Sequence, residues 1–387
     1  MHISYQDIHQ EKNPNLPNPL PFGKIGTNHV FLMDFNKKEW VNPRIVPNKD
    51  IPVSLSAVVL HYGQAAFEGA KAFWHEDDEI YTFRIDENAK RMNNSARILC
   101  MPRIPVEDQI EAIHSLIDVD RYWVPKSDDC SLYIRPFMFG SDSNLGVKPS
   151  TNYTFAVILK PSGPYYKDGF KPNNLMITKK FHRAAPGGTG AAKAAGNYAM
   201  SLRAGELARR FGANQVLYLD VNNEFIEEAG AMNHYHVLKD ETIIIPEWTD
   251  TILKSITSKS VLELSESHGF KARQEHIRIN NFLEQIYSGE IIEAGGFGTA
   301  AVVAPVGKYL LLKDEIIDEQ TIDDILDDKI PKNELEQFYD EIIVGDGNIG
   351  MVTKNLYQTY NQIQRGKLPA PDGWLMKVEK KFLESQH

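Results

Sequence analysis

Cysteine, long apolar runs and an excess of basic residues are all missing from this chain. Only Cys100 and Cys130 occur among the 387 residues, far apart and in no C-x-x-C pattern. A disulfide framework and a cysteine-ligated metal site are therefore not expected. No apolar run approaches the roughly 18 residues that cross a bilayer, and residues 1–7 lack the basic and apolar regions of a secretory signal. The sequence predicts a cytoplasmic protein.

The charge balance narrows the classes of partner. A formal net charge of −10 and a pI near 5.7 argue against a surface for nucleic acid or for an anionic membrane. Hydrophobic residues make up 42% and charged residues 24% of the chain, which is typical of a globular protein. A chain of this length is expected to form two domains.

Short strands and a few helices alternate irregularly, which favours an α+β fold with mostly antiparallel, barrel-like sheets. Turn-forming residues concentrate at 161–172. We therefore expect a smaller domain over 1–163, an interdomain segment over 164–178 and a larger domain over 179–387. The expected strands are 29–35, 72–74, 80–84, 132–137, 153–159, 175–178, 215–219, 236–238, 242–245, 297–304 and 341–344.

Apolar residues at helical spacing predict helices over 86–99, 106–117, 257–268 and 281–287. Asp86 is expected to cap the first of these. A further helix follows the glycine-rich stretch 186–198 and ends at Gly212. Its buried face is expected to contain Met200, Leu202, Leu207 and Ala208.

The stretch 186–198 (PGGTGAAKAAGNY) contains an unusual lysine. Lys193 lies among alanines and glycines, with no carboxylate within five residues. It could simply cover apolar surface with its stem. Alternatively, the amine is partly desolvated, so that its pKa falls and it acts as a nucleophile.

Residues 341–350 (EIIVGDGNIG) fit a strand that ends in G-x-G-x-x-G. This is the dinucleotide-binding pattern, and it would support an NAD-dependent oxidoreductase. The pattern also requires a following parallel strand with an acidic residue about 20 positions on. The chain instead continues into 366–373 (GKLPAPDG), so a turn before a helix is the preferred interpretation.

Three features together indicate pyridoxal phosphate, which needs a lysine, a partner for its pyridine nitrogen and a phosphate cradle. Lys193 would be the lysine. The carboxylates in 225–233 (FIEEAGAMN) could face the nitrogen, although a solvated acidic turn is the simpler alternative. The phosphate could bind at the helix start at 255–258, at the loop 295–301, or to Arg91. Ordinary capping, a tight turn and a solvated arginine remain alternatives.

Six ordered motifs resemble the branched-chain amino-acid aminotransferases, which are fold-type IV pyridoxal-phosphate enzymes. The resemblance extends over almost the whole chain from about residue 22. The motifs are LHYGQAAFEGAKAF (60–73), SLYIRPF (131–137), GGTGAAKAAGNY (187–198), IEEAGAMN (226–233), FGTAAVVAPVG (297–307) and GNIGMVTKNLYQTYNQIQRGK (347–367).

The resemblance implies a role for each matching residue. Lys193 would be the Schiff-base lysine and the catalytic base, Glu228 the partner of the pyridine nitrogen, and Tyr198 a hydrogen-bond partner of the ring oxygen. The phosphate would be held by Arg91, Ile256, Thr257, Gly298 and Thr299. The substrate would contact Tyr62, Phe67, Tyr133, Arg135, Ala231 and Ala300.

The implied reaction is transamination of leucine, isoleucine and valine with 2-oxoglutarate, in a homodimer without metal. A D-amino-acid aminotransferase or an aminodeoxychorismate lyase is the alternative within the same fold class. The chain departs from the family pattern at Lys254-Ser255, where Pro-Gly is usual, and at Gly295-Gly296-Phe297. The second departure moves a phenyl ring, which makes the substrate preference less certain than cofactor binding.

Overall fold

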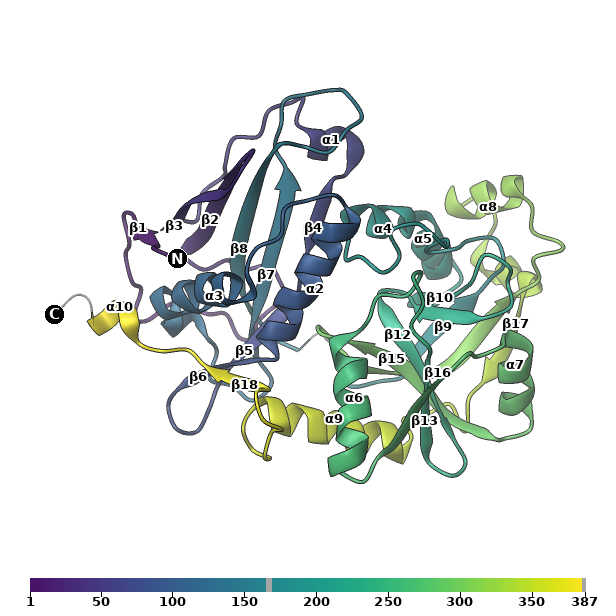
Figure 1. Cartoon of the computed structure of the whole chain (residues 1–387). Helices are drawn as coiled ribbons and strands as arrows, with labels where there is room; N and C mark the ends of the chain where they lie inside the picture. The colour runs from purple at the N-terminus through teal and green to yellow at the C-terminus, as the bar shows by residue number, and fades with distance from the viewer. Residues whose placement is uncertain (165–168, 385–387) are drawn as a thin grey trace. The chain divides into compact units, whose positions relative to one another are not determined.

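The computed structural model describes residues 1–164 and 169–384, and the chain forms two compact units (Figure 1). Unit 1 comprises residues 1–167, 192–196 and 361–387, and unit 2 comprises 168–191 and 197–360. The expected division assigned all of 179–387 to one domain, so it differs at 192–196 and at the C-terminal segment. Residues 165–168 of the expected interdomain segment lie outside the described residues.

The sheet of unit 1 is antiparallel except where β1 joins β3. Its strand order is β1 (Ser4–Tyr5), β3 (Trp40–Pro47), β2 (His29–Asn36), β8 (Asn152–Ser162), β7 (Ser131–Gly140), β5 (Ala70–Trp74), β6 (Ile80–Phe83) and β18 (Leu375–Lys377), and β4 (Ala65–Phe67) also pairs with β7. The helical segments of this unit are α1 (Val58–Tyr62), α2 (Ile85–Ile98), α3 (Val106–Val119), η1 (Arg121–Trp123) and α10 (Lys381–Glu384).

Helices α2 and α3 pack together, and α3 covers β2 and β8. Apolar side chains from both layers form one core, in which Phe31, Met92, Leu116 and Phe155 are fully buried. The hydrophobic effect of burying this face holds the helices on the sheet.

The sheet of unit 2 closes on itself. Its strand order is β11 (Ile226–Ala229), β10 (Gln215–Leu219), β9 (Asn173–Ile177), β16 (Val302–Leu312), β15 (Ile291–Gly298), β12 (Met232–Leu238), β13 (Thr242–Pro246) and β14 (Lys271–Glu275), while β17 (Tyr339–Ile343) pairs with β16. An additional pairing of β11 with β12 completes a ring from β11 to β12. The expected α+β class with a barrel-like sheet is confirmed.

Helices surround this ring (Figure 1). Helices α6 and α7 pack on β15, and α5 packs on β10. The helical segments are α4 (Ala195–Met200), α5 (Leu202–Arg210), α6 (Ile256–Ser267), α7 (Ile279–Tyr287), α8 (Glu319–Leu326), η2 (Lys332–Phe338) and α9 (Met351–Gln364), of which α4 and α9 also extend into unit 1. Among the described residues, no helix has the length and apolar character needed to span a membrane.

Two local expectations were wrong. Arg84, not Asp86, occupies the N-cap of α2, and Asp86 lies in the first helical turn. The helix expected after the glycine-rich stretch is two helices separated at Ser201. Because this break interrupts the helical periodicity, Met200 and Leu202 are 61% and 70% exposed rather than buried.

The G-x-G-x-x-G sequence at 345–350 does not form a dinucleotide-binding unit. Strand β17 before it is antiparallel to β16, whereas the nucleotide fold needs parallel strands. The start of α9 is already occupied by an internal anion, because Glu293 accepts from the backbone N–H of Val352 at 3.0 Å and of Thr353 at 2.7 Å. A Cβ on Gly350 would clash with the Glu293 side chain, which explains this glycine.

We expect Gly350→Ala to destabilise the protein by about 2–4 kcal/mol, because the Glu293 carboxylate must move and weaken two charge-assisted hydrogen bonds. Gly205→Ala is the matched control. Gly205 lies in α5 with open space around its Cα, so this change should be neutral or stabilise the helix by up to about 1 kcal/mol. Urea unfolding monitored by circular dichroism measures both. Equal stability of the two variants would contradict this role of Gly350.

Candidate active site

The backbone of residues 192–196 is anchored within unit 1. Phe67 of β4 donates its N–H to the Lys193 carbonyl at 3.1 Å. The Lys193 N–H donates to Ser95 Oγ of α2 at 2.8 Å, and Ala194 forms an antiparallel bridge with Ala66. A strand and a helix therefore fix the backbone that carries the Lys193 side chain.

The Lys193 amine lies in a cationic and aromatic environment. Its Nζ is 4.8 Å from the centroid of the Phe67 ring, and the Arg135 guanidinium lies 4.7 Å from the same ring. Arg135 Nη2 also donates to the Tyr133 hydroxyl at 3.0 Å. Burial, with Arg91 and Arg135 nearby, lowers the pKa of Lys193 to about 8 from its ordinary value of 10.5. The amine is thus closer to its neutral, nucleophilic form than a surface lysine.

Arg91 of α2 is engaged by a carboxylate that the sequence did not single out. Its Nε and Nη2 donate to the two oxygens of Glu68 at 2.7 and 2.9 Å. Asn88 Nδ2 donates to the same carboxylate at 2.7 Å, and Glu68 is only 1% exposed. Such a bidentate pair fixes the guanidinium in one orientation.

The expected substrate residues of unit 1 do not all share this environment. Phe67, Tyr133 and Arg135 lie around Lys193, as described. Tyr62 is 43% exposed at the end of α1, and its hydroxyl donates to the Leu145 carbonyl.

In unit 2, Glu228 is held at the end of β11. The carboxylate is 3% exposed and accepts from the Leu253 N–H at 2.7 Å. Arg183 Nη2 lies 3.1 Å from the same oxygen, Oε1, and also donates to the Thr251 carbonyl at 2.6 Å. The arginine and the backbone donor therefore fix the orientation of this buried carboxylate.

The glycine-rich stretch runs beside the segment that carries Thr251. Arg183 donates to the Gly190 carbonyl at 3.1 Å, and the Ala191 N–H donates to the Asp250 carbonyl at 2.9 Å. A side chain on Gly190 would clash with the Thr251 backbone. The glycine is therefore required for this close approach of two backbone segments.

Asn233 organises the start of α6. Its Oδ1 accepts from the Ser255 N–H at 3.3 Å and from Ser258 Oγ at 3.1 Å, and its Nδ2 donates to the Leu253 carbonyl at 2.9 Å. Within the described residues, the backbone N–H groups of Ile256 and Thr257 have no protein acceptor. A helix start with unsatisfied donors is suited to an anion such as a phosphate.

The remaining expected residues lie in turns or on α4. Gly298, Thr299 and Ala300 are half-buried at the turn between β15 and β16, and Tyr198 is half-buried on α4. Ala231 is exposed between β11 and β12.

Phe297, which departs from the family pattern, is 1% exposed. Its ring stacks on Tyr235, with centroids 4.2 Å apart and planes inclined by 10°. The phenyl ring therefore packs in the core of unit 2 rather than at the turn.

Four residues that organise the site were not predicted. Glu68 and Asn233 lie inside motifs that were recognised, and each combines a polar side chain with mostly apolar or small neighbours, which is a usable signal of a buried role. Ser95 and Arg183 gave no such signal, since a helical serine and a single arginine are common on surfaces.

Comparison with known proteins agrees with this arrangement. The Amino-transferase class IV family model matches residues 65–309. A branched-chain-amino-acid aminotransferase 2 of Bacillus subtilis is 38% identical over 94% of this chain and 93% of its own. The branched-chain amino acid aminotransferase of Escherichia coli has a TM-score of 0.70 at 26% identity, over 91% of this chain and 100% of its own.

Two further solved structures of a branched-chain amino acid aminotransferase, both from T.th., carry ligands. One contains pyridoxamine 5′-phosphate and has a TM-score of 0.70. The other is complexed with N-(5′-phosphopyridoxyl)-L-glutamate and has a TM-score of 0.68. Each is 26% identical to this chain and covers 92% of it and 100% of its own length. The family model, the relatives that are 38% identical over nearly the whole chain, and the shared fold show that this chain belongs to the class IV aminotransferases.

Proposed function

We propose that this enzyme transfers the amino group of branched-chain L-amino acids to 2-oxoglutarate, giving branched 2-oxo acids and L-glutamate. The half-buried Lys193, whose pKa is lowered to about 8, is the observation that carries this proposal. An aminotransferase needs an amine that is neutral often enough to act as nucleophile and base.

The cofactor is pyridoxal 5′-phosphate, which withdraws electrons from the substrate Cα and carries the amino group between the two half-reactions. Lys193 holds it covalently and carries a proton to and from the substrate Cα. Glu228 keeps the pyridine nitrogen protonated, and Arg183 and the Leu253 N–H hold that carboxylate in place. Tyr198 orients the ring through its hydroxyl.

The phosphate is assigned to the start of α6, where Ile256 and Thr257 offer backbone donors, and to the turn with Gly298 and Thr299. Arg91 adds positive charge. Because Glu68 fixes its guanidinium, the arginine is oriented before an anion arrives, which reduces the entropic cost of binding.

The substrate side chain is assigned to Tyr62, Phe67 and Tyr133, an apolar and aromatic set suited to branched aliphatic groups. Arg135 would pair with the side-chain carboxylate of the glutamate co-substrate, and Ala231 and Ala300 would receive the α-carboxylate. Two findings support this choice: the relatives are named for branched-chain amino acids, and one of the T.th. structures contains a phosphopyridoxyl derivative of L-glutamate.

The proposal includes a homodimer in the cytoplasm. A D-amino-acid aminotransferase and an aminodeoxychorismate lyase are alternatives of the same fold class, but the near-full-length relatives favour the branched-chain reaction. An NAD-dependent reaction has no support at 345–350, because Glu293 occupies the start of α9.

The reaction is tested by spectroscopy and a substrate panel. The purified enzyme should show visible absorbance from its bound cofactor, which L-leucine bleaches and 2-oxoglutarate restores. Because each substrate reacts in its own half-reaction, L-leucine alone should give one half-turnover, and 2-oxoglutarate should react only with enzyme that L-leucine has already converted. Activity with D-amino acids but not with L-leucine, or pyruvate formation from aminodeoxychorismate, would overturn the proposal.

Lys193→Ala should lower kcat by about 10²–10⁴-fold or more, because a positioned proton carrier contributes about that factor to the rate. Small amines such as methylamine should restore part of the rate. Lys90→Ala, on the exposed face of α2, provides the matched control and should retain full activity. A Lys193→Ala enzyme with near-normal kcat would remove Lys193 from the mechanism.

The lowered pKa of Lys193 can be measured in the apoenzyme. Only the neutral amine attacks the cofactor aldehyde, so the rate of reconstitution should rise with pH and reach half its maximum near pH 8. Arg135→Met should raise this midpoint, because a neighbouring cation that disfavours the ammonium form is removed. Stopped-flow absorbance between pH 6.5 and 11 gives the midpoints. A wild-type midpoint above pH 10 would contradict the assigned environment.

A further inference from the structure

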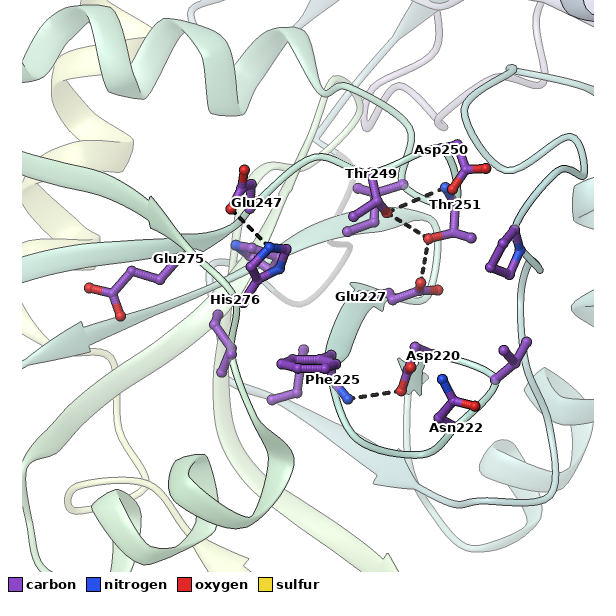
Figure 2. A pocket seen from close by; sticks show the side chains of 16 residues that line it. Asp220, Asn222, Phe225, Glu227, Glu247, Thr249, Asp250, Thr251, Glu275 and His276 are labelled. Atoms are coloured by element: carbon purple, nitrogen blue, oxygen red, sulfur yellow. Dashed lines mark hydrogen bonds and ion pairs between the residues drawn. The ribbon is translucent and has the colours of Figure 1, made fainter.

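A cavity lies in unit 2, on the other side of the strand from the Glu228 side chain. Glu227 and Glu228 are neighbours in β11, and successive side chains of a strand point to opposite faces. Glu228 meets Arg183 and the Leu253 N–H. Glu227 instead lines a cavity of about 270 Å³ (Figure 2). The two adjacent carboxylates therefore have different surroundings.

Glu227 is an incompletely bonded acid at the base of this cavity. It is 5% exposed, and its Oε1 accepts from Thr251 Oγ1. Within the described residues, its other oxygen, Oε2, has no hydrogen-bond partner. Leaving a buried polar atom unpaired costs about 1–3 kcal/mol, which a ligand with a suitable donor would recover. Burial also raises the pKa of Glu227, and Thr251 opposes that rise.

The other acids at the cavity already have partners. Asp220 accepts from the Phe225 N–H at 2.9 Å, Asp250 accepts from the Gly187 N–H at 2.8 Å, and Glu275 accepts from Arg273 Nε at 2.6 Å. Glu247 lies 3.1 Å from His276. These carboxylates make the surroundings strongly negative, so they attract cations and repel carboxylates.

Apolar side chains complete the cavity wall. Ile252 and Ile277 are nearly buried, and Val221 is 40% exposed. A volume of about 270 Å³ is enough for a small branched molecule. The described residues contain no group of three or more side chains suited to a metal ion, so an organic cation fits better than a metal.

We propose that this cavity binds a small organic ammonium ion with an apolar body and no carboxylate. Its ammonium group pairs with the Glu227 carboxylate, and its hydrocarbon part lies against Ile252 and Ile277. Hydrogen bonds connect this site to Glu228, the proposed partner of the pyridine nitrogen. Thr251 donates to Glu227, and the Thr251 carbonyl accepts from Arg183, which pairs with Glu228. A ligand here would therefore lie beside Glu227 and Thr251, and Thr251 connects them to Arg183.

The test is isothermal titration calorimetry with 3-methylbutylamine. The enzyme is loaded with pyridoxamine 5′-phosphate, because an amine condenses with the aldehyde of pyridoxal phosphate but not with pyridoxamine. We expect one saturable site in unit 2. The uncharged molecule of the same carbon skeleton, 3-methylbutanol, should bind at least tenfold more weakly, because it cannot form an ion pair with Glu227. Absence of amine binding, which would indicate that water alone fills the cavity, would overturn the proposal.

Variants locate the site. Glu227→Gln keeps the shape but removes the charge, and should weaken amine binding at least tenfold. Glu284→Gln makes the same charge change on the exposed face of α7 and should alter the affinity less than twofold. Val221→Trp at the rim should also weaken binding without touching Glu227, which keeps the test decisive if Glu227→Gln folds poorly. Unchanged affinity in the folded variants would overturn the proposal.

Discussion

The structure of the proposed site depends on five residues, 192–196, that pack with unit 1 although the chain on both sides belongs to unit 2. Two backbone hydrogen bonds and a bridge hold this segment to β4 and α2. The anchoring is made by main-chain atoms of this segment and by Ser95. Its low pKa follows from where the backbone places it, because burial is the largest cause of the shift.

In unit 2, the polar groups of the proposed site also lie on strands and helices whose positions further hydrogen bonds fix. Asn233 ties the Leu253 carbonyl to the start of α6, and the Leu253 N–H holds Glu228. The assigned nitrogen partner and the assigned phosphate donors are therefore linked through one short segment. Such support keeps a site within the narrow geometry that catalysis requires.

Much of this arrangement could be predicted from the sequence because its parts are local. Lys193 among small residues, the paired carboxylates before a tight turn, and a serine before an amphipathic helix are all visible within short windows. The helix break at Ser201 was not predicted, because residues 199–203 contain neither proline nor glycine to mark it. Contacts between distant positions also escaped prediction: Glu68 with Arg91, Arg183 with Glu228, and Glu293 with the start of α9.

The closed ring of unit 2 also bears on the solubility of the folded enzyme. Strands within the ring have neighbours on both sides, so they offer no open edge to another chain. The outermost strands beyond the ring are charged: β14 reads KARQE, and β17 exposes Asp340 and Glu341. In unit 1, the terminal strands β1 and β18 have only two and three residues. Short or charged edges are the usual protection against edge-to-edge aggregation, and this protein uses both.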